Sequence, residues 1–485
     1  MTLNLLQPCA FVAGEWIPAA GGTSIVVDDP STGKSLGEVP RLGRVETARA
    51  IEAAARAQRD WAARPARQRS AILKGWFDRI VLERESLAHL LTAEQGKPLS
   101  EARAEIDYAA SFIEWFAEEA KRVTGDVIPG HEADKRIIVL KQPVGVVAAI
   151  TPWNFPAAMV TRKLAPALAA GCAIVLKPAS QTPFTALALA ALAQQAGLPD
   201  GLLSVITGNA SEIGAELCAN PDVRKLTFTG STEIGRQLIA ATAGTVKRLS
   251  LELGGNAPFI VFDDADLDAA VDGAIQSKFR NAGQTCVCSN RLLVHDRIYD
   301  DFAERLRARV EAMNVGPGMA FDTDIGPLID EPAVAKVETH VADALAKGAR
   351  LVCGGTPHPA GRRYYRPTVL GEVAENMLVS REETFGPVAP LRRFESDEQA
   401  IALANDTEFG LASYFYSADA DRLFRVAEAL EFGIVGVNTG LISTEVAPFG
   451  GIKQSGYGRE GSRYGIDDYL NLKYVCIGLK AGGSA

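Results

Sequence analysis

The chain has 485 residues, a formal net charge of −9 and a hydrophobic content of 47%, so it is long enough for two or three domains with apolar cores. The acidic balance and the lack of dense lysine or arginine blocks argue against nucleic acid as a partner, and no apolar run is long enough to span a bilayer. Residues 1–16 lack the basic and apolar regions of a secretion signal, and the seven cysteines follow no disulfide framework, so we expect a reducing, cytoplasmic setting.

The first part of the chain is predicted to be helical, and the second is predicted to alternate between strands and helices. Residues 45–119 are rich in Ala, Arg and Glu, with Pro65 and Pro98 as breaks. Beyond them, strands are expected at 144–150, 173–177, 203–206, 225–229 and 248–252, and helices at 157–170, 184–196, 210–219 and 232–241. Strands that alternate with helices of this length indicate βαβ units, hence a parallel sheet and a Rossmann-like dinucleotide-binding domain.

A second α/β domain follows. Its expected strands are 258–262, 291–295, 388–394, 413–416 and 433–438. An apolar stripe at Leu267, Val271, Ile275 and Phe279 predicts a helix that ends at Gly283. The organisation is thus residues 1–125 and 142–252 as the dinucleotide-binding domain and residues 253–452 as the catalytic domain.

Two β-like segments, 126–141 and 466–485, fit neither domain. As edge strands they would be left unpaired in a monomer. We expect them to pair with each other and with a second subunit, which predicts a homo-oligomer, either a dimer or a tetramer.

The loop after Gly283 carries two thiols, Cys286 and Cys288. Thiols placed there can be a nucleophile, metal ligands or a redox pair, and many free cysteines are simply buried. The five histidines are dispersed and no companion ligands accompany the cysteines, so no metal site is expected.

Polar residues follow two of the predicted strands. Glu252 ends the apolar strand 248–252, where a lone carboxyl is either ion-paired in the core or a general base facing the ligand crevice. Asn154 follows the strand 144–150, and its amide either shapes a turn or donates to an oxyanion.

Two further loops suit a nucleotide. Residues 228–235 include Gly230 and Ser231 between a strand and a helix, which either makes a tight turn or places a phosphate at the helix N-terminus. Lys177 and Ser180 follow the second strand. They either shape the loop or accept a ribose 2′-phosphate, which favours NADP over NAD.

Taken together, seven segments resemble the motifs of the aldehyde dehydrogenase superfamily over nearly the whole chain. They are Pro152-Trp153-Asn154-Phe155-Pro156, Lys177-Pro178-Ala179-Ser180, Phe228-Thr229-Gly230-Ser231, Leu251-Glu252-Leu253-Gly254-Gly255, Gly283-Gln284-Thr285-Cys286, Glu383-Thr384-Phe385-Gly386-Pro387 and Pro448-Phe449-Gly450-Gly451. Each is modest alone, but all seven in this order are highly specific.

The resemblance implies the fold, with a small β oligomerisation domain, and a role for each site residue. Cys286 is expected to be the nucleophile, Glu252 the base for the deacylating water and Asn154 the oxyanion donor. The residues implied in binding NADP or NAD are Trp153, Lys177, Ser180, Gly230, Ser231, Glu383 and Phe385. Within this group Lys177 and Ser180 contact the adenosine ribose, Ser231 the pyrophosphate, and Glu383 with Phe385 the nicotinamide.

Within the superfamily, the residues around Arg162, Arg280 and Ser443 resemble succinate-semialdehyde dehydrogenases. There, two arginines and a serine bind the distal carboxylate of the substrate, and Phe449 is expected to line the same site. A guanidinium suits a carboxylate because it donates two parallel hydrogen bonds. Arg280 could instead be a surface residue.

Succinate semialdehyde is therefore the expected substrate, oxidised to succinate through a cysteine thiohemiacetal and thioester. Glutarate semialdehyde competes, because one methylene changes binding by only about 1–3 kcal/mol. A CoA-acylating aldehyde dehydrogenase and a non-catalytic nucleotide-binding protein are the remaining alternatives, which Glu252 and Cys286 disfavour. In this branch Cys288 can form an inhibitory disulfide with Cys286; otherwise it is a passive thiol.

Overall fold

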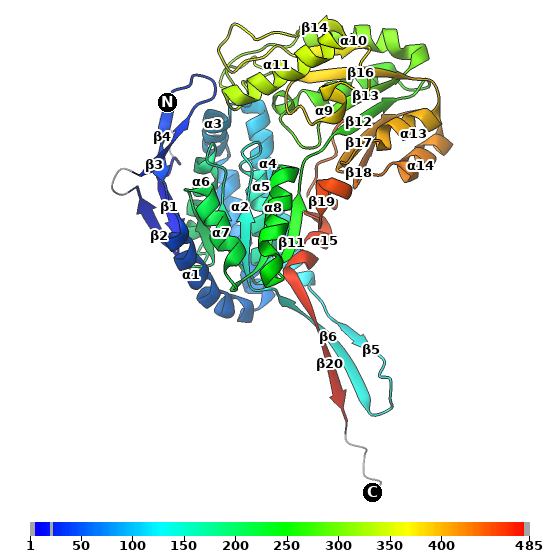
Figure 1. The fold of residues 1–485 in the computed structure, drawn as a ribbon. Helices are drawn as coiled ribbons and strands as arrows, with labels where there is room; N and C mark the ends of the chain where they lie inside the picture. Colours follow the sequence, from blue (N-terminus) through cyan, green and yellow to red (C-terminus); the bar gives the residue numbers. More distant parts are fainter. Residues whose placement is uncertain (1–4, 20–22, 480–485) are drawn as a thin grey trace.

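The computed structural model describes residues 5–19 and 23–479, which form two α/β lobes and a projecting β arm (Figure 1). The helices of the first lobe are α1 (Arg44–Ala63), α2 (Ala66–Leu82), α3 (Arg84–Gln95), α4 (Leu99–Glu119), α5 (Ala158–Ala170), α6 (Pro183–Gln195), α7 (Ala210–Ala219) and α8 (Thr232–Thr242). Those that follow are α9 (Leu267–Lys278), α10 (Tyr299–Glu311), α11 (Glu331–Ala346), α12 (Leu378–Arg381), α13 (Asp397–Asn405), α14 (Ala420–Ala429) and α15 (Ser462–Gly465).

The first lobe is built on an eight-stranded sheet. In spatial order its strands are β2 (Glu15–Pro18), β1 (Cys9–Val12), β9 (Leu203–Val205), β8 (Ala173–Lys177), β7 (Val146–Ile150), β10 (Val223–Thr229), β11 (Arg248–Glu252) and β19 (Gly456–Tyr457). The five central strands are parallel, while β1, β2 and β19 are antiparallel additions at the edges. The predicted alternation of strands and helices, and with it the Rossmann-like sheet, is confirmed.

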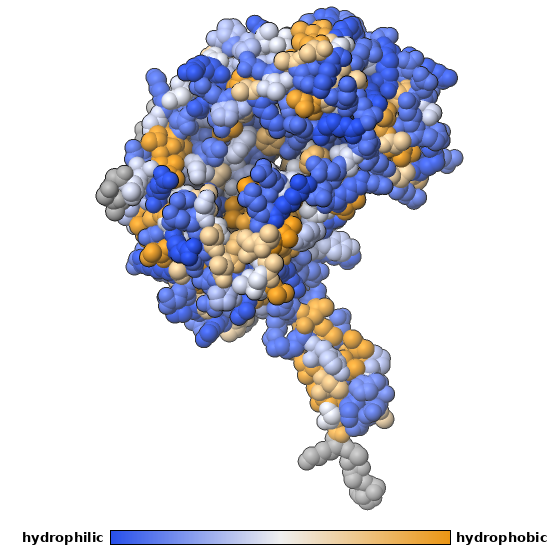
Figure 2. Space-filling model, viewed as in Figure 1, coloured by the Kyte–Doolittle hydropathy of each residue, from blue (hydrophilic) through white to orange (hydrophobic). Residues whose placement is uncertain are grey.

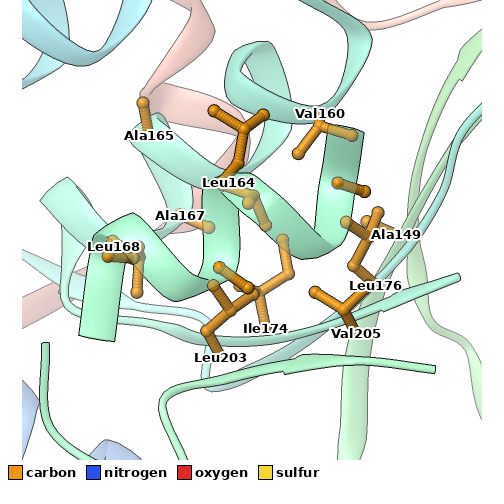
Figure 3. Close-up of a cluster of buried hydrophobic side chains, with 14 of the residues drawn as sticks. Ala149, Val160, Leu164, Ala165, Ala167, Leu168, Ile174, Leu176, Leu203 and Val205 are labelled. Atoms are coloured by element: carbon orange, nitrogen blue, oxygen red, sulfur yellow. The ribbon is translucent and has the colours of Figure 1, made fainter. Parts of the chain in front are cut away.

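Helix α5 explains how charged groups come to lie inside this lobe. All of its residues are buried, because one side packs on β8 and the other sides are covered by α4 and α2. Figure 3 shows Val160, Leu164 and Leu168 of α5 above Ile174 and Leu203 of the sheet. A helix buried all round carries even its polar residues into the interior.

The second lobe contains a seven-stranded sheet. Its spatial order is β14 (Arg350–Cys353), β15 (Thr368–Gly371), β16 (Val388–Phe394), β13 (Ser289–His295), β12 (Ala257–Val261), β17 (Ala412–Tyr416) and β18 (Ile434–Val437). Only β14 is antiparallel to its neighbour; the others are parallel. The second α/β unit is therefore confirmed.

The arm is a three-stranded sheet of β5 (Asp126–Ile128), β6 (Lys135–Pro143) and β20 (Leu470–Gly478). Strand β20 pairs with β6 along its whole length, so the expectation that these distant segments pair with each other is confirmed. Much of the arm surface is apolar (Figure 2), with Val127 81% and Leu472 72% exposed. Residues 1–4 and 480–485, which the predicted domain ranges include, lie outside the described residues.

Two features differ from the prediction. The strands β1 and β2, and the hairpin of β3 (Ser24–Asp28) and β4 (Ser35–Pro40), were not expected. Helix α9 ends at Lys278 rather than at Gly283, because Asn281 and Ala282 adopt left-handed φ angles of 53° and 55°. Among the described residues, no helix has the length and apolar character needed to span a membrane.

Candidate active site

A cavity of about 300 Å³ lies where loops of the two lobes meet. The loops after β7, β10 and β11 line it from the first lobe, in keeping with the rule that ligands bind at the carboxyl ends of parallel strands. The second lobe contributes α11 and the loops that carry Cys286 and Glu383. Of the predicted site residues, the cavity wall contains Trp153, Asn154, Gly230, Ser231, Cys286, Glu383 and Phe385.

The loop that carries Cys286 is held in an unusual conformation by close backbone contacts. Gly283 has a φ of 74°, and a Cβ there would lie 2.2 Å from the carbonyl oxygen of Gly386. A Cβ on Gly255 would lie 2.3 Å from the carbonyl oxygen of Cys286. Both positions therefore require glycine, and both allow the backbone of the loop to approach its neighbours closely.

Buried amides fix the same loop from the other side. Asn281 donates from Nδ2 to the carbonyl oxygen of Asn154 at 3.0 Å, and its backbone amide donates to Glu101 Oε2 at 2.8 Å. Gln284 accepts a hydrogen bond from the backbone amide of Ile329 at 3.0 Å. These contacts join the predicted nucleophile loop to α4 and to the loop after β7.

Asn154 lies against the backbone of the nucleophile loop. Its Nδ2 donates to the carbonyl oxygen of Gln284 at 3.0 Å, while its Oδ1 is buried without a partner among the described residues. The side chain is 4% exposed. One Nδ2 hydrogen remains for a ligand that reaches the cavity, as the oxyanion role requires.

Glu252 does not line the cavity but lies beneath it in a buried group of charges. Its Oε2 is buried without a partner among the described residues. Burial, followed by the negative charge of Glu460, raises the pKa of Glu252 well above its usual range. A carboxyl with a raised pKa holds its proton more tightly than an ordinary one, which suits a general base.

Glu460 is paired with two cations of α5. Its Oε2 lies 2.9 Å from Nη2 of Arg162, and Lys163 Nζ donates to its Oε1. Burial disfavours the charge of Glu460, but Lys163 and Arg162 outweigh it and lower its pKa. The carboxylate is thus ionised inside the protein, balanced by two positive charges.

Cys286 is a protonated thiol in this arrangement. Burial is the main cause that raises its pKa to about 12, and the carboxyls of Glu383 and Glu252 add to the effect, while Arg162 opposes it. Because the thiolate is the nucleophile, Cys286 needs a base or a change in its surroundings on ligand binding in order to react.

The nucleotide side of the cavity has free polar groups. Thr229 Oγ1 is buried without a partner among the described residues, and it lies next to Gly230 and Ser231 in the wall. Ser231 caps α8, with its Oγ accepting from the amide of Ile234 at 3.4 Å. A helix N-terminus with unsatisfied donors suits a phosphate group, so these residues fit a dinucleotide.

The predicted adenosine contacts, Lys177 and Ser180, lie outside the cavity wall, in the loop after β8. Lys177 Nζ donates to the carbonyl oxygen of Pro178 at 2.9 Å, and burial lowers the pKa of its amine to about 8. A buried ammonium without a carboxylate close by gains from an incoming anion. This fits the ribose phosphate end of NADP.

Glu383 and Phe385, the residues predicted to contact the nicotinamide, both lie in the cavity wall. Phe385 packs edge-on against Trp153, with ring centroids 5.5 Å apart. Glu383 Oε1 accepts from the amide of Gly255 at 3.2 Å, and burial raises the pKa of this carboxyl to about 7.

Three of the predicted substrate residues, Arg162, Arg280 and Phe449, lie outside the cavity wall. Arg162 is 1% exposed and stacks on Phe449, with its guanidinium carbon 4.0 Å from the ring centroid. Its Nη1 lies 3.8 Å from Sδ of Met159, which lines the cavity. Arg280 is half-buried and lies over Phe155, 5.4 Å from the ring centroid.

Ser443 is half-buried in the loop that leads to Phe449. Among the described residues, Ser443 makes no hydrogen bond with either arginine, so its part in the site stays a prediction.

Cys288 is placed differently from Cys286. It is buried and does not line the cavity; Lys278 Nζ lies 3.2 Å from its Sγ, and Asn290 Oδ1 lies 3.5 Å away. Both cysteines are free thiols. In the described part of the chain, no three His, Cys, Asp or Glu side chains are grouped to hold a metal ion.

Sequence reasoning missed Lys163 and Glu460 as site residues. Each stands in a segment that the sequence singles out, next to Arg162 and in the glycine-rich run at 457–462. Their pairing joins positions 297 residues apart, so no local pattern could reveal it.

Comparison with known proteins agrees with this geometry. Residues 16–475 match the aldehyde dehydrogenase family. The chain is 63% identical to the NADP(+) succinate-semialdehyde dehydrogenase GabD of Escherichia coli, over 98% of this chain and 99% of that protein. It is 62% identical to a glutarate-semialdehyde dehydrogenase of Pseudomonas aeruginosa, over 98% of both. A crystal structure of an Escherichia coli NADP-dependent enzyme superposes with a TM-score of 0.98 at 63% identity, covering 99% of both chains. The chain therefore belongs to the aldehyde dehydrogenase family.

Proposed function

We propose that the protein oxidises succinate semialdehyde to succinate, with NADP as the preferred cofactor and NAD as a weaker one. The observation that carries this proposal is the arrangement of four side chains in and next to the cavity. Cys286, Asn154 and Glu383 meet in one cavity, and a buried arginine, Arg162, lies behind its wall at Met159. The similarity to GabD supports the same substrate and cofactor.

The chemistry starts at Cys286. Its thiolate adds to the aldehyde carbon, and the oxyanion that forms accepts hydrogen bonds from Asn154 Nδ2 and the backbone amide of Cys286. NADP, when bound, supplies the hydride acceptor for the next step. Loss of hydride leaves a thioester on Cys286, which water must hydrolyse.

Glu252 is the base for that water. Burial and the charge of Glu460 raise its pKa, which makes the ionised carboxylate a stronger base for water. Glu460, which Arg162 and Lys163 hold ionised, is the negative neighbour that keeps the proton affinity of Glu252 high. The released acid is succinate.

Arg162, Arg280, Ser443 and Phe449 are the residues we assign to the distal carboxylate. Two guanidinium groups favour an aldehyde with a negative end, and Phe449 keeps Arg162 in place by stacking.

Glutarate semialdehyde is the second candidate. A relative 62% identical to this chain carries that activity in its name, and one methylene changes binding by only about 1–3 kcal/mol. Both semialdehydes present the same groups to the site.

Steady-state kinetics with succinate semialdehyde, glutarate semialdehyde and butanal, each with NADP and NAD, test the proposal. The wild type should favour a semialdehyde over butanal by kcat/KM, and NADP over NAD. Arg162→Ala and Arg280→Ala should lower semialdehyde turnover far more than butanal turnover. Equal losses on both substrates would contradict the carboxylate site.

The same proposal extends to the domains of the chain, its oligomeric state and its cellular compartment. We assign residues 1–125 and 142–252 to nucleotide binding and 253–452 to catalysis. The exposed apolar strands of the arm support a homo-oligomer, a dimer or tetramer, and the seven free thiols support a reducing, cytoplasmic setting. Size-exclusion chromatography with light scattering measures the oligomer.

A further inference from the structure

Several hydrogen-bond donors near Arg162 are buried without partners. Among the described residues, Tyr108 Oη and both Nε and Nη2 of Arg162 have no hydrogen bond. Nη2 lies 2.9 Å from Glu460 Oε2, but the two atoms are not aligned as donor and acceptor, and Oε2 also remains without a hydrogen bond. Buried donors are almost always satisfied in folded proteins, so this group points to an acceptor that comes from a ligand.

Tyr108 is linked to Arg162 through the ring of Phe112. It lies one turn before Phe112 on α4, and the two rings meet edge to face with centroids 4.9 Å apart. The guanidinium carbon of Arg162 lies 5.6 Å from the centroid of Phe112 and 4.0 Å from that of Phe449. Aromatic rings therefore enclose Arg162, and Tyr108 places a polar atom at the edge of this enclosure.

The charges around Tyr108 favour an anionic acceptor. Burial raises the pKa of its phenol, so the hydroxyl stays neutral and can donate; Arg162 and Arg280 oppose that rise, and the carboxylates of Glu460 and Glu445 add to it. Both arginines of the proposed carboxylate site thus act on this hydroxyl. Glu460 is already engaged with Lys163, and Glu445 with Ser111 at 3.2 Å.

We propose that Tyr108 is a specificity-determining residue whose hydroxyl donates to the distal carboxylate of the substrate, beside Arg162 and Arg280. This inference rests on the proposed function. It adds to Arg162, Arg280 and Ser443 a further donor from α4, an element that the sequence motifs do not include. A neutral aldehyde such as butanal has no group to accept this hydrogen bond and gains nothing from it.

The test is Tyr108→Phe, which removes only the hydroxyl and keeps the ring against Phe112. Tyr365→Phe is the matched control, because Tyr365 is a buried tyrosine of the second lobe, outside the cavity. The KM for succinate semialdehyde, the inhibition constant for succinate, the kcat/KM for butanal and the Tm are measured for both variants and the wild type.

In Tyr108→Phe, the KM for succinate semialdehyde and the inhibition constant for succinate should both rise about tenfold, as expected for a hydrogen bond to a charged group. The kcat/KM for butanal should stay within about twofold of the wild type, and Tyr365→Phe should change neither substrate. Unchanged succinate binding in Tyr108→Phe, or an equal loss on butanal, would overturn the inference.

The two proposals fail differently. If Arg162→Ala and Arg280→Ala abolish the preference for succinate semialdehyde while Tyr108→Phe leaves it intact, only the role of Tyr108 is wrong. If the wild type shows no preference over butanal and does not bind succinate, the proposed function is wrong and the role of Tyr108 falls with it.

Discussion

Replacing Glu460 by glutamine removes the negative charge from the buried cluster beneath the active site. Glu460 is 4% exposed and lies between Arg162 and Lys163, which are also buried. In Glu460→Gln, an amide of nearly the same shape remains, so packing changes little. Two buried cations, however, lose their counter-ion.

The expected cost is that of breaking a buried ion pair from one side, about 3–5 kcal/mol. Lys163 keeps a hydrogen bond to Thr227 Oγ1 at 3.1 Å, which favours the lower end of that range. For a chain of this length, such a loss lowers the Tm by about 3–5 °C. The exposed Glu118→Gln, whose partners Lys74 and Lys121 lie at the surface, should change the Tm by no more than about 1 °C.

The double variant Glu460→Gln/Arg162→Met separates charge from packing. It removes one of the two uncompensated cations, so it should recover about 1–2 kcal/mol relative to Glu460→Gln alone. Urea unfolding and thermal melts at one scan rate, followed by circular dichroism, measure both effects. A Tm within about 2 °C of the wild type for Glu460→Gln, or strictly additive losses in the double variant, would refute the reasoning.

The effect also has a defined pH dependence. Lys163 and Arg162 outweigh burial and lower the pKa of Glu460, so its carboxylate stabilises the fold above the pKa of the unfolded chain. This stabilisation is lost as the pH falls through the lower, folded-state pKa. The difference between wild type and Glu460→Gln should therefore shrink in acid.

Three further variants test the chemistry. Asn154→Ala removes the side-chain oxyanion donor and should lower kcat by about 10²–10³-fold, with little change in Tm. Wild-type kcat should rise with pH as Glu252 ionises, at a higher pH than for an ordinary carboxyl, because burial and the charge of Glu460 raise its pKa; Glu252→Gln should lose steady-state turnover and that pH dependence. Hydrogen peroxide oxidises Cys286 to a sulfenic acid, which Cys288 can attack with loss of water to form a disulfide. Cys288→Ala should therefore weaken the part of peroxide inactivation that a thiol reverses. Unchanged peroxide sensitivity would show that Cys288 takes no part.

Much of the fold was predictable because its central strands are fully buried. Strand β8 is a continuous apolar run closed by Lys177, while β11 carries Leu249 and Leu251 and is closed by Glu252; both have the predicted bounds. In a parallel sheet, these closing residues meet at one edge. The position of the active site therefore followed from the strand pattern.

The parts of the fold that could not be predicted depend on contacts between segments that are distant in the sequence. The end of α9 was misplaced because Phe279 continues the apolar stripe, while Asn281 and Ala282 leave the helix only under the constraint of buried partners such as Glu101. The short strands β1 and β2 owe their conformation to the edge of the sheet that they join.

Tyr108 shows the same limit for function. On α4 it belongs to an ordinary amphipathic helix, and only the tertiary fold brings its hydroxyl to the enclosure around Arg162.

The most direct test of the central claim is to trap the acyl-enzyme. Glu252→Gln is mixed with succinate semialdehyde and NADP, quenched in acid and mapped by peptide mass spectrometry. The account predicts one succinyl group per chain, attached to Cys286 as a thioester, and one NADPH formed for each group. An unmodified Cys286 despite NADPH formation, or the acyl group on another residue, would contradict it.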